Sequence, residues 1–178
     1  MSNTFSWLLL LGAFMLATNY AEKMALQTAD KNKQYLAYGI YILAEALIFV
    51  PLLGIIIDFV PNSETLLTKA AIVTLSLFTG LSAVVFITKK DFSFLKSILT
   101  IGFFLAIGLI IAGAIFGFDL GLWFSVGMCV LAAGSILYQT SNLIHNYSND
   151  QYIPAALGLF ASLMLLFWYI IQIFLSRD

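Results

Sequence analysis

Residues 66–88, 89–93 and 94–116 read LLTKAAIVTLSLFTGLSAVVFIT, KKDFS and FLKSILTIGFFLAIGLIIAGAIF. Each outer stretch is long enough for a membrane-spanning helix, which needs about 20 mostly apolar residues to cross roughly 30 Å of hydrocarbon. The break between them carries two lysines and an aspartate, and charged side chains are costly to place inside a bilayer. The pattern therefore predicts two transmembrane helices joined by a short loop in water.

The same pattern continues on both sides of this pair. We predict an all-α, polytopic membrane helix bundle in a single transmembrane domain over residues 1–178. Six helices are expected, at about 5–20, 35–57, 66–88, 94–116, 120–143 and 153–175. No Lys or Arg precedes the first apolar run, so we interpret it as a membrane helix rather than a signal peptide.

The composition excludes a water-soluble globule. Of the 178 residues, 62% are hydrophobic and 10% are charged, whereas soluble domains carry about 25% charged residues. The formal net charge of -1 gives no indication of a nucleic-acid partner. The excess of apolar side chains is therefore expected to face the lipid bilayer.

The lysines predict an orientation for the helices. They cluster at Lys23, Lys31 and Lys33 between the first two predicted helices, and at Lys89, Lys90 and Lys96 between the third and fourth. Because cytoplasmic loops carry an excess of Lys and Arg, both loops are predicted to be cytoplasmic. The turn near Asp119 is then outside, and the loop that contains His145 and Asp150 is cytoplasmic.

Glu45 is the charged residue that lies well inside a predicted span. Tyr38, Tyr41 and Glu45 share one face at helical spacing. One interpretation is a cation or proton pathway that faces the bundle interior, because intramembrane acids often mark such pathways. The other is a buried, protonated carboxyl that forms a hydrogen bond to a neighbouring helix, since burial favours the uncharged form.

The sequence predicts neither an enzyme nor a metal or cofactor site. Cys129 is the single cysteine and His145 is the single histidine, whereas a zinc site needs several such ligands. An intramembrane serine protease needs a Ser nucleophile and a His base from another buried helix. His145 instead lies near the end of a predicted helix, so we expect no catalytic residues.

Residues 88–95 (TKKDFSFL), 136–142 (ILYQTSN) and 155–167, which begin AALGLF, form an ordered set of motifs. They resemble, in turn, the signature loop, the end of the penultimate helix and the start of the last helix of the Bax inhibitor 1 family (the transmembrane Bax inhibitor motif proteins). Residues 44–53 (AEALIFVPLL) are a weaker match to the third helix of the family. The spacing and order of the motifs agree over half of the chain.

This resemblance implies a bundle of seven helices in which the last is enclosed by the others. Six spans are predicted here, so the chain is expected to be a short version, or a truncated product, that lacks the first helix of the family. Family members are linked to the leak of cations, chiefly calcium, to suppression of cell death in eukaryotes, and to membrane-protease regulation and stress in bacteria. The resemblance therefore implies a calcium leak or stress-response protein in a bacterial cytoplasmic (inner) membrane. The alternative is a non-conducting regulatory partner of membrane proteins such as a membrane protease.

The sequence departs from the family at a pair of pH-sensing aspartates on the last two helices. The matching positions are Gln139 and Ser162, and uncharged residues form no carboxylate pair whose protonation opens and closes a pore. Glu45 then remains to attract a cation, with Tyr41 and Tyr38 beside it as pathway candidates. We expect weak or absent pH gating, and we expect the family motif loop at Lys89, Lys90 and Asp91.

Overall fold

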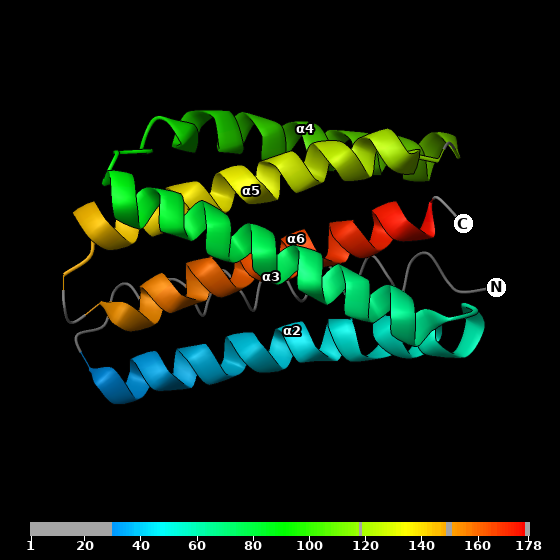
Figure 1. The fold of residues 1–178 in the computed structure, drawn as a ribbon, viewed down its shortest axis with the longest axis horizontal. Coiled ribbons are helices and arrows are strands. Elements are labelled where there is room, and N and C mark those ends of the chain that lie inside the picture. The colour runs from blue at the N-terminus through cyan, green and yellow to red at the C-terminus, as the bar shows by residue number, and fades with distance from the viewer. Residues whose placement is uncertain (1–29, 118, 149–150, 177–178) are drawn as a thin grey trace. The chain divides into compact units, whose positions relative to one another are not determined.

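The computed structural model describes residues 30–117, 119–148 and 151–176, which form five α-helices and no strand (Figure 1). The helices are α2 (Lys31–Phe59), α3 (Ser63–Thr88), α4 (Leu95–Phe116), α5 (Gly121–His145) and α6 (Tyr152–Leu175). All five have the length and apolar composition of membrane spans. The helical membrane architecture is thus confirmed, and the chain is an integral membrane protein. The predicted first span, residues 5–20, lies outside the described residues.

Several helices extend beyond the apolar stretches that predicted them. The prediction began the second span at residue 35, whereas α2 begins at Lys31. Its first turn is polar and is capped by Asp30, whose carboxylate accepts a hydrogen bond from the N–H of Asn32 at 2.9 Å. The fifth span was expected to end at residue 143, but α5 continues to His145. Apolar runs mark the hydrocarbon-spanning part of a helix, while caps and polar turns set its ends.

The chain divides into two compact units. The first contains α2 and the start of α6 as far as Leu157. In this unit the hydroxyl groups of Tyr35 and Tyr152 lie 2.8 Å apart, and the ammonium group of Lys31 lies 5.8 Å from the centre of the Tyr152 ring. The second unit contains α3, α4, α5 and the rest of α6 from Gly158. The single transmembrane domain over residues 1–178 stays a prediction.

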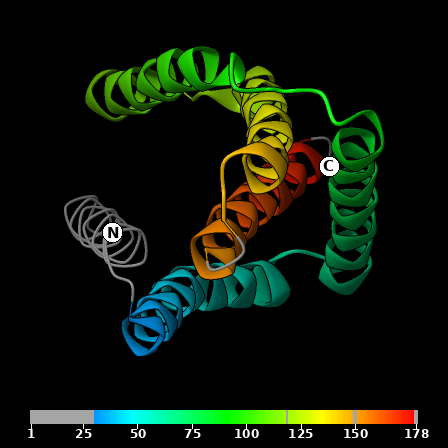
Figure 2. The same ribbon diagram turned by 90° about the vertical axis from the view of Figure 1, so that its left-hand side faces the viewer.

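Within the second unit, α5 packs against both α3 and α4. Figures 1 and 2 show α4 running beside α5. Two glycine contacts allow this approach, one from each helix. A Cβ atom on Gly134 of α5 would lie 3.3 Å from the side chain of Leu99, and one on Gly102 of α4 would overlap with Leu131. Small residues of this kind let membrane helices pack closely.

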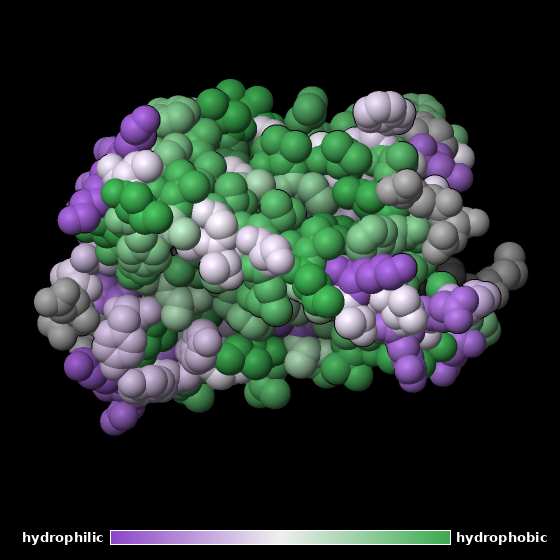
Figure 3. Space-filling model, viewed as in Figure 1, coloured by the Kyte–Doolittle hydropathy of each residue, from purple (hydrophilic) through white to green (hydrophobic). Residues whose placement is uncertain are grey.

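The helices keep large apolar side chains exposed, as a lipid environment requires. Between 11% (α4) and 28% (α6) of the most apolar segment of each helix is buried, so most residues of these segments keep some exposed surface. Figure 3 shows hydrophobic residues along the helices in view and hydrophilic residues gathered near helix ends. α6 is the most buried of the five helices. Its enclosure by all the other helices stays a prediction.

Candidate functional site

The intramembrane acid Glu45 lies on a buried stripe of α2. Gln34, Ala37, Tyr41 and Glu45 are all buried and recur at helical spacing. Glu45 is 7% exposed, and its Oε1 atom accepts a hydrogen bond from the hydroxyl of Tyr41 at 3.2 Å. Tyr38 is half-buried, and within the described residues no hydrogen bond joins it to Glu45. The structure therefore brings two of the three pathway candidates together.

Ser162, one of the two residues predicted to match the family aspartates, is buried at the contact between α5 and α6. It is 4% exposed, and its hydroxyl lies 2.7 Å from that of Ser135. The Ser162 hydroxyl also donates to the carbonyl of Gly158 at 2.9 Å. Because a hydroxyl has a single hydrogen, Ser135 is the donor between the two serines. Ser162 is thus held by neutral partners on both sides.

Gln139, the other matching position, lies against the same stretch of α6. A Cβ atom on Gly158 would be 2.7 Å from the Cδ and Oε1 atoms of the Gln139 amide, so this side chain occupies the space that glycine leaves. No hydrogen bond joins Gln139 to Ser162 within the described residues. Gln139 therefore contacts α6 at Gly158, one helical turn before Ser162, and the two residues do not form a hydrogen-bonded pair.

Ser135 was missed by the sequence prediction. It lies one helical turn before Gln139, on the same face of α5. Further along α5, Thr140 is fully buried, and its hydroxyl lies 3.4 Å from that of Ser82 on α3. These groups form a neutral polar layer, which we define as Ser82, Ser135, Gln139, Thr140 and Ser162.

Hydrogen bonds attach the family motif loop to the end of α5. The Oδ1 atom of Asp91 accepts hydrogen bonds from the backbone N–H of Ser93 at 2.8 Å and from its hydroxyl at 2.5 Å. These two bonds are the main reason that the pKa of Asp91 is below its ordinary value, and the nearby His145 lowers it further. The backbone N–H of Phe92 donates to the buried Ser141 hydroxyl at 2.9 Å. Both lysines of the loop, Lys89 and Lys90, are exposed.

His145 makes the second attachment of this loop, which the sequence prediction also missed. Its Nε2 atom lies 3.1 Å from the carbonyl oxygen of Lys89, and its Nδ1 atom lies 3.0 Å from that of Ser141. The Ser141 hydroxyl is 3.5 Å from Nδ1. A general base needs a nitrogen directed at its nucleophile, but both nitrogens here face main-chain carbonyls. The arrangement is suited to holding the loop.

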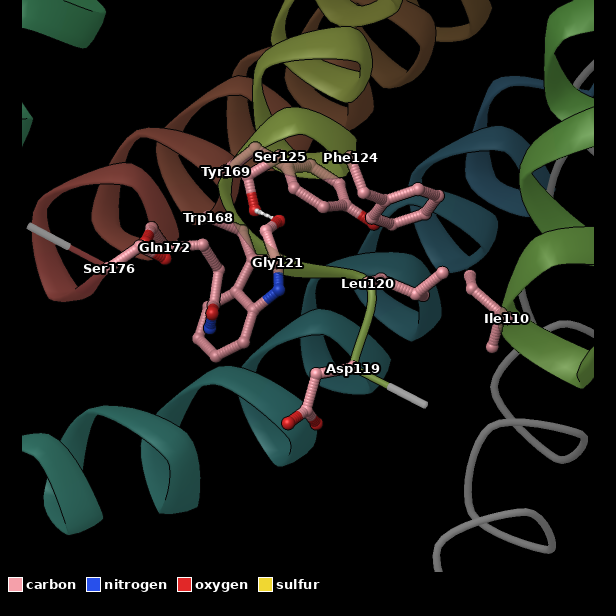
Figure 4. Close-up of a pocket in the computed structure, with 10 residues that line it drawn as sticks. All are labelled: Ile110, Asp119, Leu120, Gly121, Phe124, Ser125, Trp168, Tyr169, Gln172 and Ser176. Atoms are coloured by element: carbon pink, nitrogen blue, oxygen red, sulfur yellow. Dashed lines mark hydrogen bonds between the residues drawn. The ribbon is translucent and has the colours of Figure 1, made fainter. Parts of the chain in front are cut away.

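The second unit also has an open cavity of about 430 Å³ between the ends of its helices (Figure 4). Asp119 is its one carboxylate, and α6 contributes Trp168, Tyr169 and Gln172. The Tyr169 ring packs edge-on against Phe124 with centroids 6.0 Å apart. The lining holds no histidine, cysteine or lysine. No group of three His, Cys, Asp or Glu residues that fits a metal ion occurs among residues 30–117, 119–148 and 151–176.

Comparison with known proteins agrees with the family resemblance. A family model described as inhibitor of apoptosis-promoting Bax1 matches residues 1–178. An uncharacterised protein of Pseudomonas aeruginosa is 39% identical over 64% of this chain and 51% of its own length. Bax inhibitor 1 of Schizosaccharomyces pombe is 31% identical over 62% of this chain and 42% of its own.

The modulator of FtsH protease YccA of Escherichia coli is 34% identical over 59% of this chain and 49% of its own length. The chain thus spans about half the length of the curated relatives that it matches. No solved structure matches it. With a family model that matches from end to end, and with the motif loop attached to the penultimate helix, the chain belongs to the Bax inhibitor 1 family.

Proposed function

We propose that this protein is a non-conducting regulatory partner of another membrane protein, such as a membrane protease, in a bacterial cytoplasmic membrane. The observation that carries the proposal is the neutral polar layer, whose hydroxyl groups pair with one another or with main-chain carbonyls. In many cation pathways, ionisable side chains face the route. A layer of neutral groups that satisfy each other favours a closed contact between α5 and α6.

The chemistry of calcium supports the same conclusion. Calcium takes about 6–8 oxygen ligands, several of them usually carboxylates. At the positions of the family aspartates, the chain offers the amide of Gln139 and the hydroxyl of Ser162. A passing ion would have to break the Ser135–Ser162 hydrogen bond without a carboxylate to replace it. The layer therefore favours a sealed bundle.

Two observations support a membrane-protein partner. A relative from Escherichia coli is named for modulating the protease FtsH. In addition, α4 is the least buried of the five described helices, with 11% of its most apolar segment buried. Ile101 and Phe104 on α4 are 70% and 67% exposed. This helix gives a partner an apolar surface to cover within the bilayer.

A reconstituted protease assay tests this proposal. An FtsH-type protease and a membrane substrate are placed in vesicles with and without the protein, and the rate of substrate degradation is measured. We expect the protein to change that rate and to co-purify with the protease. Ile101→Ala with Phe104→Ala is expected to weaken both effects, while the same replacements at Ile87 and Phe86 on α3 serve as the matched control. An unchanged degradation rate with no co-purification would refute the proposal.

A second candidate function is a cation path through Glu45. It is favoured by the buried carboxyl, which has the Tyr41 hydroxyl at 3.2 Å. Calcium entry into vesicles is compared between the wild type and Glu45→Gln, with Leu47→Ala, at an exposed position of the same helix, as the control. A flux that Glu45→Gln abolishes and Leu47→Ala leaves unchanged would support this path. Equal entry in protein-containing and empty vesicles would exclude it.

A further inference from the structure

We propose that His145 is a proton-binding site that controls how firmly the motif loop, residues 88–94, is attached to the end of α5. In the protonated state the imidazolium donates one hydrogen bond to the loop, at the Lys89 carbonyl, and one within α5, at the Ser141 carbonyl. In the neutral state, with its proton on Nε2, it retains the bond to the loop, and its Nδ1 atom competes with Asp91 for the hydrogen of the Ser141 hydroxyl. This inference stands on the geometry of the loop and does not depend on the proposed function.

The partners of the two ring nitrogens carry the argument. Nε2 lies 3.1 Å from the carbonyl oxygen of Lys89, and Nδ1 lies 3.0 Å from the carbonyl oxygen of Ser141. Carbonyl oxygens only accept hydrogen bonds, and a neutral imidazole has a single N–H. Only the imidazolium, which has an N–H at both positions, satisfies both contacts. Proton uptake therefore adds a hydrogen bond at this junction.

The hydroxyl of Ser141 transmits this change to the loop. Its oxygen accepts the backbone N–H of Phe92 at 2.9 Å, and it has two acceptors for its own hydrogen at 3.5 Å, Oδ1 of Asp91 and Nδ1 of His145. Nδ1 accepts a hydrogen bond only while it is unprotonated. When His145 takes up a proton, the Ser141 hydroxyl is left to donate to Asp91. Protonation thus favours the contact between the Ser141 hydroxyl and Asp91 of the loop.

The backbone of Lys89 shows why this attachment matters. Lys89 ends α3 in the left-handed conformation with φ of 51°, which lysine rarely adopts. Its own N–H bonds to the carbonyl of Val85 at 2.8 Å, and its carbonyl is the group that His145 holds. The loop therefore follows α3 through Lys89, a strained residue whose N–H and carbonyl groups both form hydrogen bonds.

Among the described residues, the charged group that interacts with His145 is the carboxylate of Asp91 on the loop. The loop also carries Lys89 and Lys90, whose side chains are exposed. The neighbours from α5 and the residues after it are uncharged, namely Ser141, Asn142, Asn146 and Tyr147. The low pKa of Asp91, caused chiefly by Ser93, keeps that carboxylate ionised at neutral pH.

Hydrogen–deuterium exchange of the protein in lipid nanodiscs tests the proposal. Protection of loop amides, corrected for the intrinsic effect of pH on exchange, is measured at about pH 5 and pH 8. We expect roughly tenfold greater protection at the lower pH, as expected for one added hydrogen bond to a charged group. His145→Gln, whose amide has N–H donors but does not titrate, is expected to remove this pH dependence. Equal pH dependence in the wild type and in His145→Gln would overturn the proposal.

A second measurement needs no substitution. Because His145 is the single histidine, protein labelled with ¹⁵N-histidine and purified without a histidine tag gives one imidazole signal pair in NMR. We expect two protonated nitrogens at low pH and a proton on Nε2 alone at high pH, since Nε2 faces Lys89 on the loop. A neutral ring with its proton on Nδ1, or an imidazole that stays neutral at about pH 5, would contradict the proposal.

Discussion

The hydroxyl of Ser162 on α6 lies 2.7 Å from the hydroxyl of Ser135 on α5. Removal of either hydroxyl leaves the other without this partner. Hydrogen bonds between membrane helices contribute about 0.6 kcal/mol on average in double-mutant cycles. We predict a coupling of about that size for Ser135→Ala and Ser162→Ala, measured by reversible unfolding in mixed micelles. Strictly additive effects would show that the serines do not interact.

Gly158 is predicted to be needed for the position of Gln139. A Cβ atom at residue 158 would lie 2.7 Å from the Gln139 amide, which is the end of a flexible side chain. Gly158→Ala is therefore expected to cost about 1 kcal/mol of unfolding free energy, at the low end for overpacking. Gln139→Ala in the same chain is expected to recover most of this cost. Gly127→Ala on α5, where a Cβ meets nothing within 4 Å, is the matched control.

Lys89 offers a prediction about strain. Glycine adopts the left-handed conformation without the steric cost that lysine bears, which is roughly 1–2 kcal/mol. Lys89→Gly is therefore expected to raise the free energy of unfolding in micelles by about 1 kcal/mol, while Lys90→Gly is expected to give no such gain. A loss of stability in Lys89→Gly, relative to Lys90→Gly, would show that the residue is not strained.

The ionised carboxylate of Asp91 is expected to stabilise the motif loop, and protonation of this group at low pH is expected to remove that stabilisation. Its pKa lies below the ordinary value of 3.8, chiefly because Ser93 donates two hydrogen bonds to the carboxylate. A carboxyl with a lower pKa in the folded state stabilises the fold above its unfolded pKa, and this contribution is lost as the pH falls through the folded value. We predict that Ser93→Ala moves the pKa of Asp91 upward, as measured by ¹³C NMR titration. An unchanged pKa would rule out Ser93 as its cause.

The sequence predicted the elements of the fold well, because runs of apolar residues long enough to cross a bilayer are hard to mistake. Each of the five described helices overlaps one predicted span. The ends were less accurate, since Asp30 and His145 extend α2 and α5 through hydrogen bonds that hydropathy does not encode. The division of the chain into two units also left no signal in the pattern of apolar runs.

The site was predicted in part, and its omissions have physical causes. Glu45 was found because a charge inside an apolar run is conspicuous, and Gln139 and Ser162 were placed by resemblance. Ser135 was missed because a single serine in an apolar helix is common, and its partner is 27 residues away. The role of His145 was missed because its hydrogen-bond acceptors are main-chain carbonyls, which every residue has.

The central claim is that the neutral polar layer closes the bundle to cations. Calcium entry into vesicles that contain the purified protein tests this claim most directly. Entry is recorded at about pH 5 and pH 8, with empty vesicles as the baseline and an added ionophore as the positive control. The account predicts that entry equals that of empty vesicles at both pH values. Entry well above the empty vesicles at either pH would contradict it.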